Sequence, residues 1–351
     1  MKLNNPELLR SQCLINGEWC DALSGKREAV INPATGVELA SIPLVSEEET
    51  QQAIAAAQRA QNDWKQLTAK QRSALLLAWA DKVLAAQEDL AQLMTAEQGK
   101  SLAEARGEVA YAASFITWFA EEAKRVDGAV LQAPQASQRL VVVKQPIGVC
   151  AAITPWNFPA AMITRKVAPA LAAGCAIIVK PAEQTPLTAL ALAKLAQDAG
   201  IPAGVLQVVT GEAAQVGRVL CDSPVVRKLS FTGSTEVGRI LMAQCAPSIK
   251  KLSLELGGNA PVIVFDDANL DAAVAGIMAS KFRNSGQTCV CANRIYVQDG
   301  IYERLAEKLV AAVEQLKVGD GSQEGTTQGP LIDSDAVAKV QSHIDDALIK
   351  G

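Results

Sequence analysis

The stretch 149–181, "VCAAITPWNFPAAMITRKVAPALAAGCAIIVKP", predicts a β-strand, a helix near 161–172 and a second β-strand. The same alternation continues through "VLQVVTG" at 205–211, "VRKLSFTG" at 226–233 and "KKLSLELGG" at 250–258. Alternation of short apolar runs with helical stretches favours a parallel sheet with helices on both faces. The sequence therefore predicts an α/β protein built around such a sheet.

Local signals mark two helix starts and one hairpin. Ser46 and Glu49 have the spacing of a capping box. Thr185 followed by Pro186 fits an N-cap and a first helical position. The segment near 128–147 contains "GAVLQAP" and "QRLVVVKQP", which predict the two strands of a hairpin that leaves the body of its domain.

The chain is long enough for two domains. Its first part is predicted to be helical after a short extended segment, and the strand–helix alternation follows. After Gly258 a second β/α segment begins, with helices near 269–284 and 301–316. We therefore expect one domain over residues 1–256 and a second over residues 257–351.

Composition narrows the class of protein. The chain has 351 residues, 49% of them hydrophobic, and a formal net charge of -4, which does not suggest binding to nucleic acid or to an anionic membrane. The opening "MKLNNPELLRSQ" lacks the apolar core of a signal peptide. The longest uncharged stretch, 145–164, contains three prolines, so we do not expect a membrane helix. We expect a cytoplasmic protein.

The stretch 284–291, "NSGQTCVC", places two cysteines two positions apart. Three roles for this pair remain open: buried packing, a metal or disulfide clamp, and a nucleophile with a second thiol beside it. The chain has no CxxC motif and only one histidine, so we expect no metal site and mostly reduced thiols. The eight cysteines are Cys13, Cys20, Cys150, Cys175, Cys221, Cys245, Cys289 and Cys291.

Three predicted strand ends carry unusual residues, and ligands bind at the carboxyl ends of strands in open parallel sheets. They are "TPWN" at 154–157, "KPAEQTP" at 180–186 and "FTGSTEVG" at 231–238. The last has the glycine spacing of a P-loop but lacks its Lys-Ser/Thr, which disfavours ATP hydrolysis. It fits a pyrophosphate at a helix N-terminus or a purely structural turn.

Lys180 and Glu183 follow a strand end directly. An ammonium that donates and a carboxylate that accepts suit the two hydroxyls of a ribose. An exposed ion pair without a ligand is the alternative for these two residues.

Cys289 needs a base or a lowered pKa to act as a nucleophile. The only histidine, His343, lies in a predicted C-terminal helix, so a Cys-His dyad is disfavoured. Glu255 is the candidate carboxylate, because it shares a strand face with Ser253 while three leucines face the other way. A glutamate on such a strand is costly to bury unless it is used.

The motifs "ITPWNFP", "KPAEQTP", "FTGSTEVG", "LELGGNAP" and "GQTC", in this order and spacing, resemble the aldehyde dehydrogenase superfamily from Cys13 to the end of the chain. Within it, "PAAMITRKVAPALAAGC", "KFRNSGQTCVCANR" and "EQGKSLAEARGEV" resemble bacterial succinate-semialdehyde dehydrogenases of 4-aminobutyrate degradation. The resemblance implies a Rossmann-type cofactor domain, an α/β catalytic domain and an oligomerisation hairpin near 128–147, in a dimer or tetramer.

The resemblance also implies a mechanism. Cys289 attacks an aldehyde, and the Asn157 amide and the Cys289 backbone N–H hold the oxyanion. After hydride transfer, Glu255 acts as general base for water that hydrolyses the thioester. NAD is the expected cofactor and NADP the alternative. Its implied contacts are Trp156, Asn157, Lys180, Pro181, Ala182, Glu183, Gly233, Ser234 and Leu256.

The resemblance assigns roles to four more residues. Arg165 and Arg283 match positions that bind the substrate carboxylate, although ordinary surface arginines are the alternative. Glu183 favours NAD, because a 2'-phosphate would meet a like charge. Cys291 is either a buried packing residue or a candidate redox partner that bridges to Cys289.

Members of the family continue beyond "ALIKG" at 347–351, so we expect a C-terminal portion to be missing, together with part of the catalytic domain. Two alternative functions remain open. One is oxidation of another acid semialdehyde, such as glutarate semialdehyde. The other is an inactive fragment that only binds nucleotide.

Overall fold

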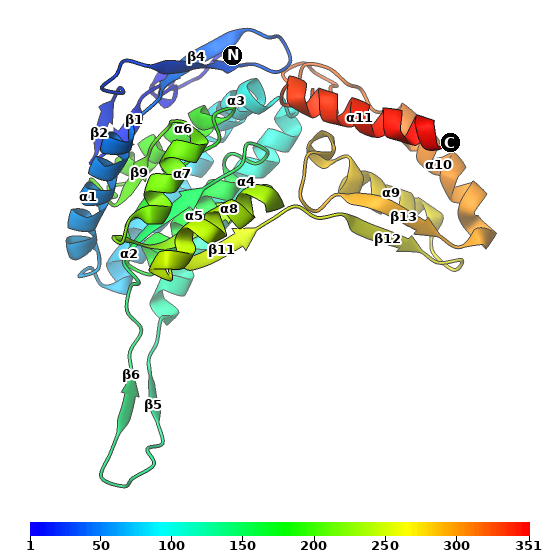
Figure 1. Ribbon diagram of the computed structural model, residues 1–351. Helices are drawn as coiled ribbons and strands as arrows, with labels where there is room; N and C mark the ends of the chain where they lie inside the picture. Colours follow the sequence, from blue (N-terminus) through cyan, green and yellow to red (C-terminus); the bar gives the residue numbers. More distant parts are fainter.

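The parallel sheet predicted from the strand–helix alternation lies at the centre of the computed structural model, which describes residues 1–351 (Figure 1). Seven strands are ordered β11-β10-β7-β8-β9-β1-β2, and the first five of these run parallel. The five parallel strands are β7 (Val149–Ile153), β8 (Ile177–Lys180), β9 (Leu206–Val208), β10 (Val226–Thr232) and β11 (Lys251–Glu255).

The strand order reverses at β7, which has β8 on one side and β10 on the other. In chain order, the parallel strands therefore read 3-2-1-4-5 across the sheet from β9 to β11. This is the Rossmann-type arrangement, in which a ligand binds outside the carboxyl ends of the strands at the reversal. The α/β fold is confirmed, and the predicted strand ends meet at this edge.

Helices cover both faces of the sheet. The larger core packs α2 (Ala69–Ala85), α3 (Gln87–Gln98), α4 (Leu102–Glu122), α5 (Ala161–Ala172) and α6 (Pro186–Asp198) against one face. The second core packs α1 (Glu47–Trp64), α7 (Ala213–Asp222) and α8 (Thr235–Cys245) against the other. Alternate residues of the buried strands enter alternate cores, as the pleat requires.

The N-terminal part contains more strands than the sequence predicted. β1 extends the sheet antiparallel to β9, β2 pairs antiparallel with β1, and two more strands form a separate pair. A pairing between β1 and β9 joins residues far apart in the chain, so local sequence does not reveal it. The strands are β1 (Cys13–Ile15), β2 (Glu18–Cys20), β3 (Arg27–Ile31) and β4 (Glu38–Pro43).

The predicted hairpin consists of β5 (Ala129–Leu131) and β6 (Leu140–Val142), and it projects far from the body of the protein (Figure 1). The chain also contains five short 3-10 helices, three before β11 and two after it. They are η1 (Pro6–Leu8), η2 (Ala123–Arg125), η3 (Ala246–Ser248), η4 (Arg283–Gly286) and η5 (Asp299–Ile301). None of the helices has the length and apolar character needed to cross a membrane.

The segment after β11 forms a second, smaller α/β unit with its own core. Two parallel strands pair with each other and not with the large sheet. The unit contains β12 (Ala260–Val264), α9 (Leu270–Lys281), β13 (Ala292–Val297), α10 (Tyr302–Glu314) and α11 (Ser334–Lys350). The division of the chain into domains 1–256 and 257–351 stays a prediction.

One predicted helix cap is present and another is not. The Ser46–Glu49 capping box forms at the start of α1. Helix α6 begins at Pro186 as predicted, but the Thr185 hydroxyl donates to the Trp156 carbonyl at 3.3 Å and caps nothing. The capping role at α6 falls instead to Glu97 of α3.

Candidate active site

The carboxyl edge of the parallel strands carries a buried ion pair. The Lys180 side chain at the end of β8 is 2% exposed and contacts the Glu183 carboxylate, which is 26% exposed. Burial lowers the pKa of Lys180, and Glu183 opposes that shift. Glu28 of β3 lies close enough that burial and the Glu183 charge raise its own pKa. No sequence motif indicated this second carboxylate.

The glycine turn after β10 leads into α8. Ser234 is the N-cap of α8 and accepts from the Val237 N–H at 3.2 Å. The Gly233 N–H donates to the Glu255 carbonyl at 3.1 Å and so joins the ends of β10 and β11. Leu256 packs against Gly238, where an added Cβ would meet Leu256 Cδ2 at 2.7 Å.

The predicted cofactor contacts therefore gather at one edge of the sheet, at the reversal point between β7 and β10. They come from the ends of four strands that lie side by side. These residues are Trp156, Asn157, Lys180, Pro181, Ala182, Glu183, Gly233, Ser234 and Leu256.

The loop before the candidate nucleophile has a strained backbone. Asn284, Ser285 and Gly286 have φ values of 51°, 55° and 76° in succession. Left-handed residues other than glycine persist only where their surroundings hold them. Asn284 is held firmly: its N–H donates to Glu104 Oε1 at 2.7 Å. Cys289, three residues beyond Gly286, is half-buried.

Asn157 joins the sheet to this loop. Its side-chain Nδ2 donates to the Gln287 carbonyl at 2.9 Å, and its own carbonyl accepts from Asn284 Nδ2 at 3.0 Å. An amide nitrogen carries two hydrogens, so one remains for an oxyanion beside Cys289. The structure thus brings Asn157 and the nucleophile loop together.

A buried ion pair that sequence reasoning missed supports Asn157. The side chains of Lys100 and Glu108 contact each other and are 1% and 2% exposed. Lys100 Nζ also donates to the Asn157 carbonyl at 2.9 Å. Glu108 Oε1 accepts from the Ala160 and Ala161 N–H groups at 2.9 and 3.2 Å, at the start of α5. The stretch "EQGKSLAEARGEV" was noticed only as part of the resemblance.

Glu255 ends β11, the edge strand of the sheet, and its side chain is exposed. The burial argument made for Glu255 is therefore wrong, because the face that it shares with Ser253 is open rather than packed. The turn that follows still contacts the nucleophile loop. A Cβ at Gly258, three residues after Glu255, would lie 3.1 Å from the Cys289 carbonyl oxygen.

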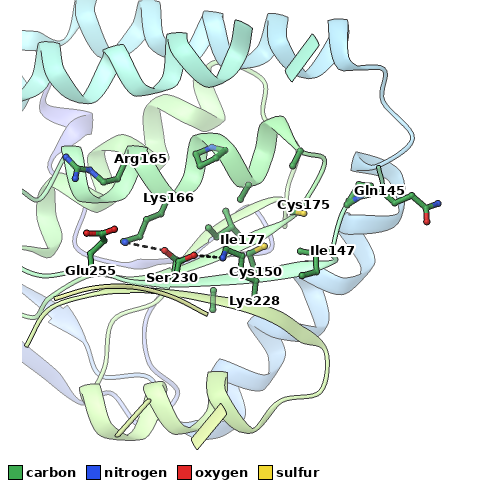
Figure 2. Close-up of a pocket in the computed structure, with 16 residues that line it drawn as sticks. Gln145, Ile147, Cys150, Arg165, Lys166, Cys175, Ile177, Lys228, Ser230 and Glu255 are labelled. Atoms are coloured by element: carbon green, nitrogen blue, oxygen red, sulfur yellow. Dashed lines mark hydrogen bonds between the residues drawn. The ribbon is translucent and has the colours of Figure 1, made fainter. Parts of the chain in front are cut away.

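Glu255 lines a cavity of about 480 Å³ beneath α5 (Figure 2). Lys166 enters the same cavity and donates to Ser230 Oγ at 3.2 Å. Burial, with the neighbouring Arg165 and Lys228, lowers the pKa of Lys166 to about 8, and Glu255 opposes the shift. An amine with that pKa exchanges protons near neutral pH, and the sequence did not single it out.

The two predicted arginines meet over one tyrosine. The Arg165 guanidinium lies 5.5 Å from the centre of the Tyr111 ring, and that of Arg283 lies 6.0 Å from the same ring. Arg283 also lies 4.8 Å from the Phe158 ring. Neither arginine forms a salt bridge, so both charges are free for an anionic ligand. Arg165 lines the cavity of Glu255, but Arg283, Asn157 and Cys289 do not.

Cys291 lies directly before β13 and is buried. Its thiol contacts the Thr288 hydroxyl at 3.0 Å, the Gly286 carbonyl at 3.3 Å and the Lys281 carbonyl at 3.4 Å. These contacts make it part of the base of the nucleophile loop. No group of three or more His, Cys, Asp or Glu side chains gathers as metal ligands would.

The fold and the site define a class of protein. The sequence model of the aldehyde dehydrogenase family matches residues 19–351. The chain belongs to this family.

Similar proteins act on acid semialdehydes. The chain is 64% identical to the succinate-semialdehyde dehydrogenase [NADP(+)] of Escherichia coli (strain K12), and 64% identical to a glutarate-semialdehyde dehydrogenase of Pseudomonas putida. Each match covers 100% of this chain and 73% of the relative. The crystal structure of succinate-semialdehyde dehydrogenase from Burkholderia pseudomallei is 61% identical, with a TM-score of 0.99 over 100% of this chain and 73% of that one.

Proposed function

We propose that this protein oxidises succinic semialdehyde to succinate with a nicotinamide dinucleotide as oxidant. The observation that carries the proposal is the junction at Asn157, whose amide donates to the loop that presents Cys289. Arg165 and Arg283, which share the Tyr111 ring without a carboxylate partner, support an aldehyde with a distal negative charge.

In this proposal the Cys289 thiolate attacks the carbonyl carbon of the aldehyde. The free hydrogen of Asn157 Nδ2 and the Cys289 backbone N–H stabilise the oxyanion that forms. Glu255 removes a proton from the water that later hydrolyses the acyl group from Cys289. Lys166, with its lowered pKa, is placed to exchange that proton with Glu255.

The residues present fit a dinucleotide at the carboxyl edge of the sheet. Lys180 and Glu183 offer a donor and an acceptor for a ribose diol, and Ser234 opens a helix N-terminus that favours a pyrophosphate. Leu256 lies at the far end of the same edge. When bound, the nicotinamide supplies the acceptor for the hydride that leaves the substrate carbon.

The first experiment is to follow reduced nicotinamide during incubation with succinic semialdehyde and NAD or NADP. We expect turnover that falls roughly a thousandfold or more in Cys289→Ala, because the nucleophile is removed. Cys20→Ala, which alters a half-buried thiol of β2, is the matched control. NAD binding without turnover in the unaltered chain would contradict the proposal and support the nucleotide-binding alternative.

NAD is the preferred cofactor in this proposal, because the carboxylates of Glu183 and Glu28 both lie near Lys180. A 2'-phosphate placed there meets like charges. Glu183→Ser is expected to lower the ratio of kcat/KM with NAD to kcat/KM with NADP by roughly tenfold or more. Glu28→Gln separates the contribution of the second carboxylate. An unchanged ratio in Glu183→Ser would overturn this preference.

The arginine pair is the proposed clamp for the substrate carboxylate. Arg283→Ala is expected to lower the preference for succinic semialdehyde over butyraldehyde by roughly tenfold or more. Arg294→Ala is the control, since Arg294 also lies over a tyrosine, at 6.0 Å from the Tyr296 ring, but belongs to β13. An unaltered preference in Arg283→Ala would remove the clamp from the proposal.

Glutarate semialdehyde is the second candidate substrate, favoured by the 64% identical relative that carries its name. It has the same two functional groups as succinic semialdehyde and one more methylene. A side-by-side comparison of kcat/KM for the two aldehydes decides between them.

The hairpin near 128–147 is proposed as the contact between copies of the chain in a homo-oligomer. Val130 and Val141 are 74% and 66% exposed on its two strands, which is unusual for paired valines. The variant Val130→Asp with Val141→Asp is expected to sediment as a smaller species than the unaltered chain. Equal sizes would contradict this role.

Two further expectations remain proposals. All eight cysteines are free thiols, which supports a reducing compartment such as the cytoplasm. Reversible bridging of Cys291 to Cys289 would first require the Cys291 thiol to leave the Gly286 and Lys281 carbonyls. Peroxide inactivation that dithiothreitol still reverses in Cys291→Ala would contradict that bridge.

A further inference from the structure

The six cysteines outside the nucleophile loop fall into neighbouring pairs. Cys13 and Cys20 are opposite each other in the β1–β2 ladder. In two other pairs, Cys150 with Cys175 and Cys221 with Cys245, the thiols are close enough for each to shift the pKa of the other. None of these thiols has a role in the proposed reaction.

The pair Cys150 and Cys175 is the one that faces the cavity lined by Glu255. Both residues line the cavity of about 480 Å³, at the opposite end from Glu255 (Figure 2). Cys150 belongs to β7 and lies directly opposite Ile177 of β8, while Cys175 precedes Ile177 by two positions. Residues two apart on a strand share a face, so both thiols point to the same side of the sheet.

The two thiols differ in acidity. The neighbouring Cys150 thiol, the backbone of Gly148 and Ile147 and the Arg72 guanidinium all lower the pKa of Cys175. The Cys175 neighbour and burial raise the pKa of Cys150, whose thiol donates to the Gly148 carbonyl at 3.7 Å. A low-pKa thiolate beside a resolving thiol is the arrangement of redox-sensitive cysteines.

We propose that Cys150 and Cys175 form a redox-active dithiol that hydrogen peroxide, entering through the cavity, converts to an intramolecular disulfide. The Cys175 thiolate attacks one peroxide oxygen and becomes a sulfenic acid, while the O–O bond breaks and hydroxide leaves as water with the proton from Cys175. The Cys150 thiol then attacks the sulfenic sulfur. The S–S bond forms, the S–O bond breaks, and a second water leaves with the Cys150 proton.

The bridge joins two thiols on the same side of the sheet, at neighbouring register positions of adjacent chain segments, where an S–S bond of about 2.05 Å can form. It would link the starts of β7 and β8 across the whole of α5, the helix that carries Arg165 and Lys166. The link lies at the amino ends of these strands, away from the cofactor contacts at their carboxyl ends.

The pair Cys221 and Cys245 provides an internal control. Both residues are 0% exposed and neither lines the cavity. Burial raises the pKa of both thiols, so neither is the ready thiolate that Cys175 is. The two pairs therefore differ in access and acidity within the same chain.

The test is to expose the unaltered chain to hydrogen peroxide, block remaining thiols with N-ethylmaleimide and map disulfides by mass spectrometry of a non-reduced digest. We expect a peptide pair linked through Cys150 and Cys175 that dithiothreitol removes, formed at least roughly tenfold faster than any Cys221–Cys245 link. Equal rates for the two pairs, or no Cys150–Cys175 link, would overturn the proposal.

A second measurement assigns the order of steps. In Cys150→Ala, peroxide should leave Cys175 as a sulfenic acid that dimedone traps, whereas in Cys175→Ala dimedone should not label Cys150. Labelling of Cys150 at the rate seen for Cys175 would contradict the assigned attack by Cys175. Because the first measurement uses the unaltered chain, poor folding of either variant does not remove the test.

Discussion

Two buried glutamates cap the starts of helices α6 and α5, and only one of the two has a counter-charge. Glu97 of α3 accepts from the Leu187 and Thr188 N–H groups of α6 at 2.7 and 2.9 Å. Glu108 of α4 does the same at the start of α5. Glu108 contacts the ammonium of Lys100, whereas Glu97 forms no salt bridge. Neither helix has a side-chain cap from its own N-cap residue.

The difference shows what a buried cap requires. Burial raises the pKa of Glu97 to about 7, although the two backbone N–H groups and Thr188 oppose the shift. Hydrogen bonds to a helix start therefore do not by themselves keep a fully buried carboxylate charged. At Glu108 a cation is built in, and the same cation holds the carbonyl of Asn157. The cap with a counter-charge is at α5, whose preceding segment contains Asn157.

Removing the Lys100 cation should have the largest effect on the free energy of unfolding. Lys100→Met leaves Glu108 buried without a counter-charge, and we expect the free energy of unfolding to fall by about 3–5 kcal/mol. Urea denaturation followed by circular dichroism measures this change. Because Lys100 also anchors Asn157, kcat should fall more than KM rises, since in the proposed reaction Asn157 acts on an oxyanion that is absent from the bound substrate.

The double variant Lys100→Met with Glu108→Gln is the control for that prediction. It removes both charges, so it should be more stable than the sum of the two single changes implies. If the changes in the free energy of unfolding were strictly additive, Lys100 and Glu108 would not interact. Glu108 would then not differ from Glu97 in having a counter-charge that stabilises it.

Glu97 should make the stability depend on pH. Its pKa is about 7 in the folded protein, against an ordinary value of 4.5, so the folded state binds the proton more tightly. The free energy of unfolding should therefore fall by roughly 3 kcal/mol from pH 4.5 to pH 7 through this group, and stay constant above it. In Glu97→Gln that contribution should disappear, as urea denaturation at several pH values would reveal.

The matched control for Glu97→Gln is Glu48→Gln, a change at an exposed glutamate of α1. It should keep the slope of the unaltered chain. If Glu97→Gln also keeps that slope, Glu97 is charged throughout the range, and the cation at Glu108 has no special significance.

The same contrast separates what the sequence could reveal about the fold from what it could not. The Ser46–Glu49 box was predictable because its partners are three residues apart. The sheet was predictable because each of its parallel strands has its own apolar run. The caps from Glu108 and Glu97 bridge 52 and 90 residues, so no local pattern contains them. The local pattern Thr185-Pro186 therefore predicted a cap from Thr185, whereas the actual cap comes from the distant Glu97.

The site divides in the same way. Local motifs and the family resemblance indicated Cys289, Asn157, Glu255 and the cofactor contacts. They could not reveal that Tyr111 of α4 holds both arginines, because that meeting depends on the packing of the nucleophile loop against α4 and α5. Nor could they show that β11 is an edge strand, and the burial argument for Glu255 failed on that point.

The local cap should have the smallest effect. Ser46→Ala removes the acceptor for the Glu49 N–H and should lower the free energy of unfolding by about 1 kcal/mol, and Ser46→Gly by only a few tenths. Urea denaturation of both variants measures the difference. No loss in Ser46→Ala would show that the box contributes nothing. A loss in Ser46→Ala as large as in Lys100→Met would mean that capping, and not the burial of an unpaired charge, sets the energies at Glu97 and Glu108.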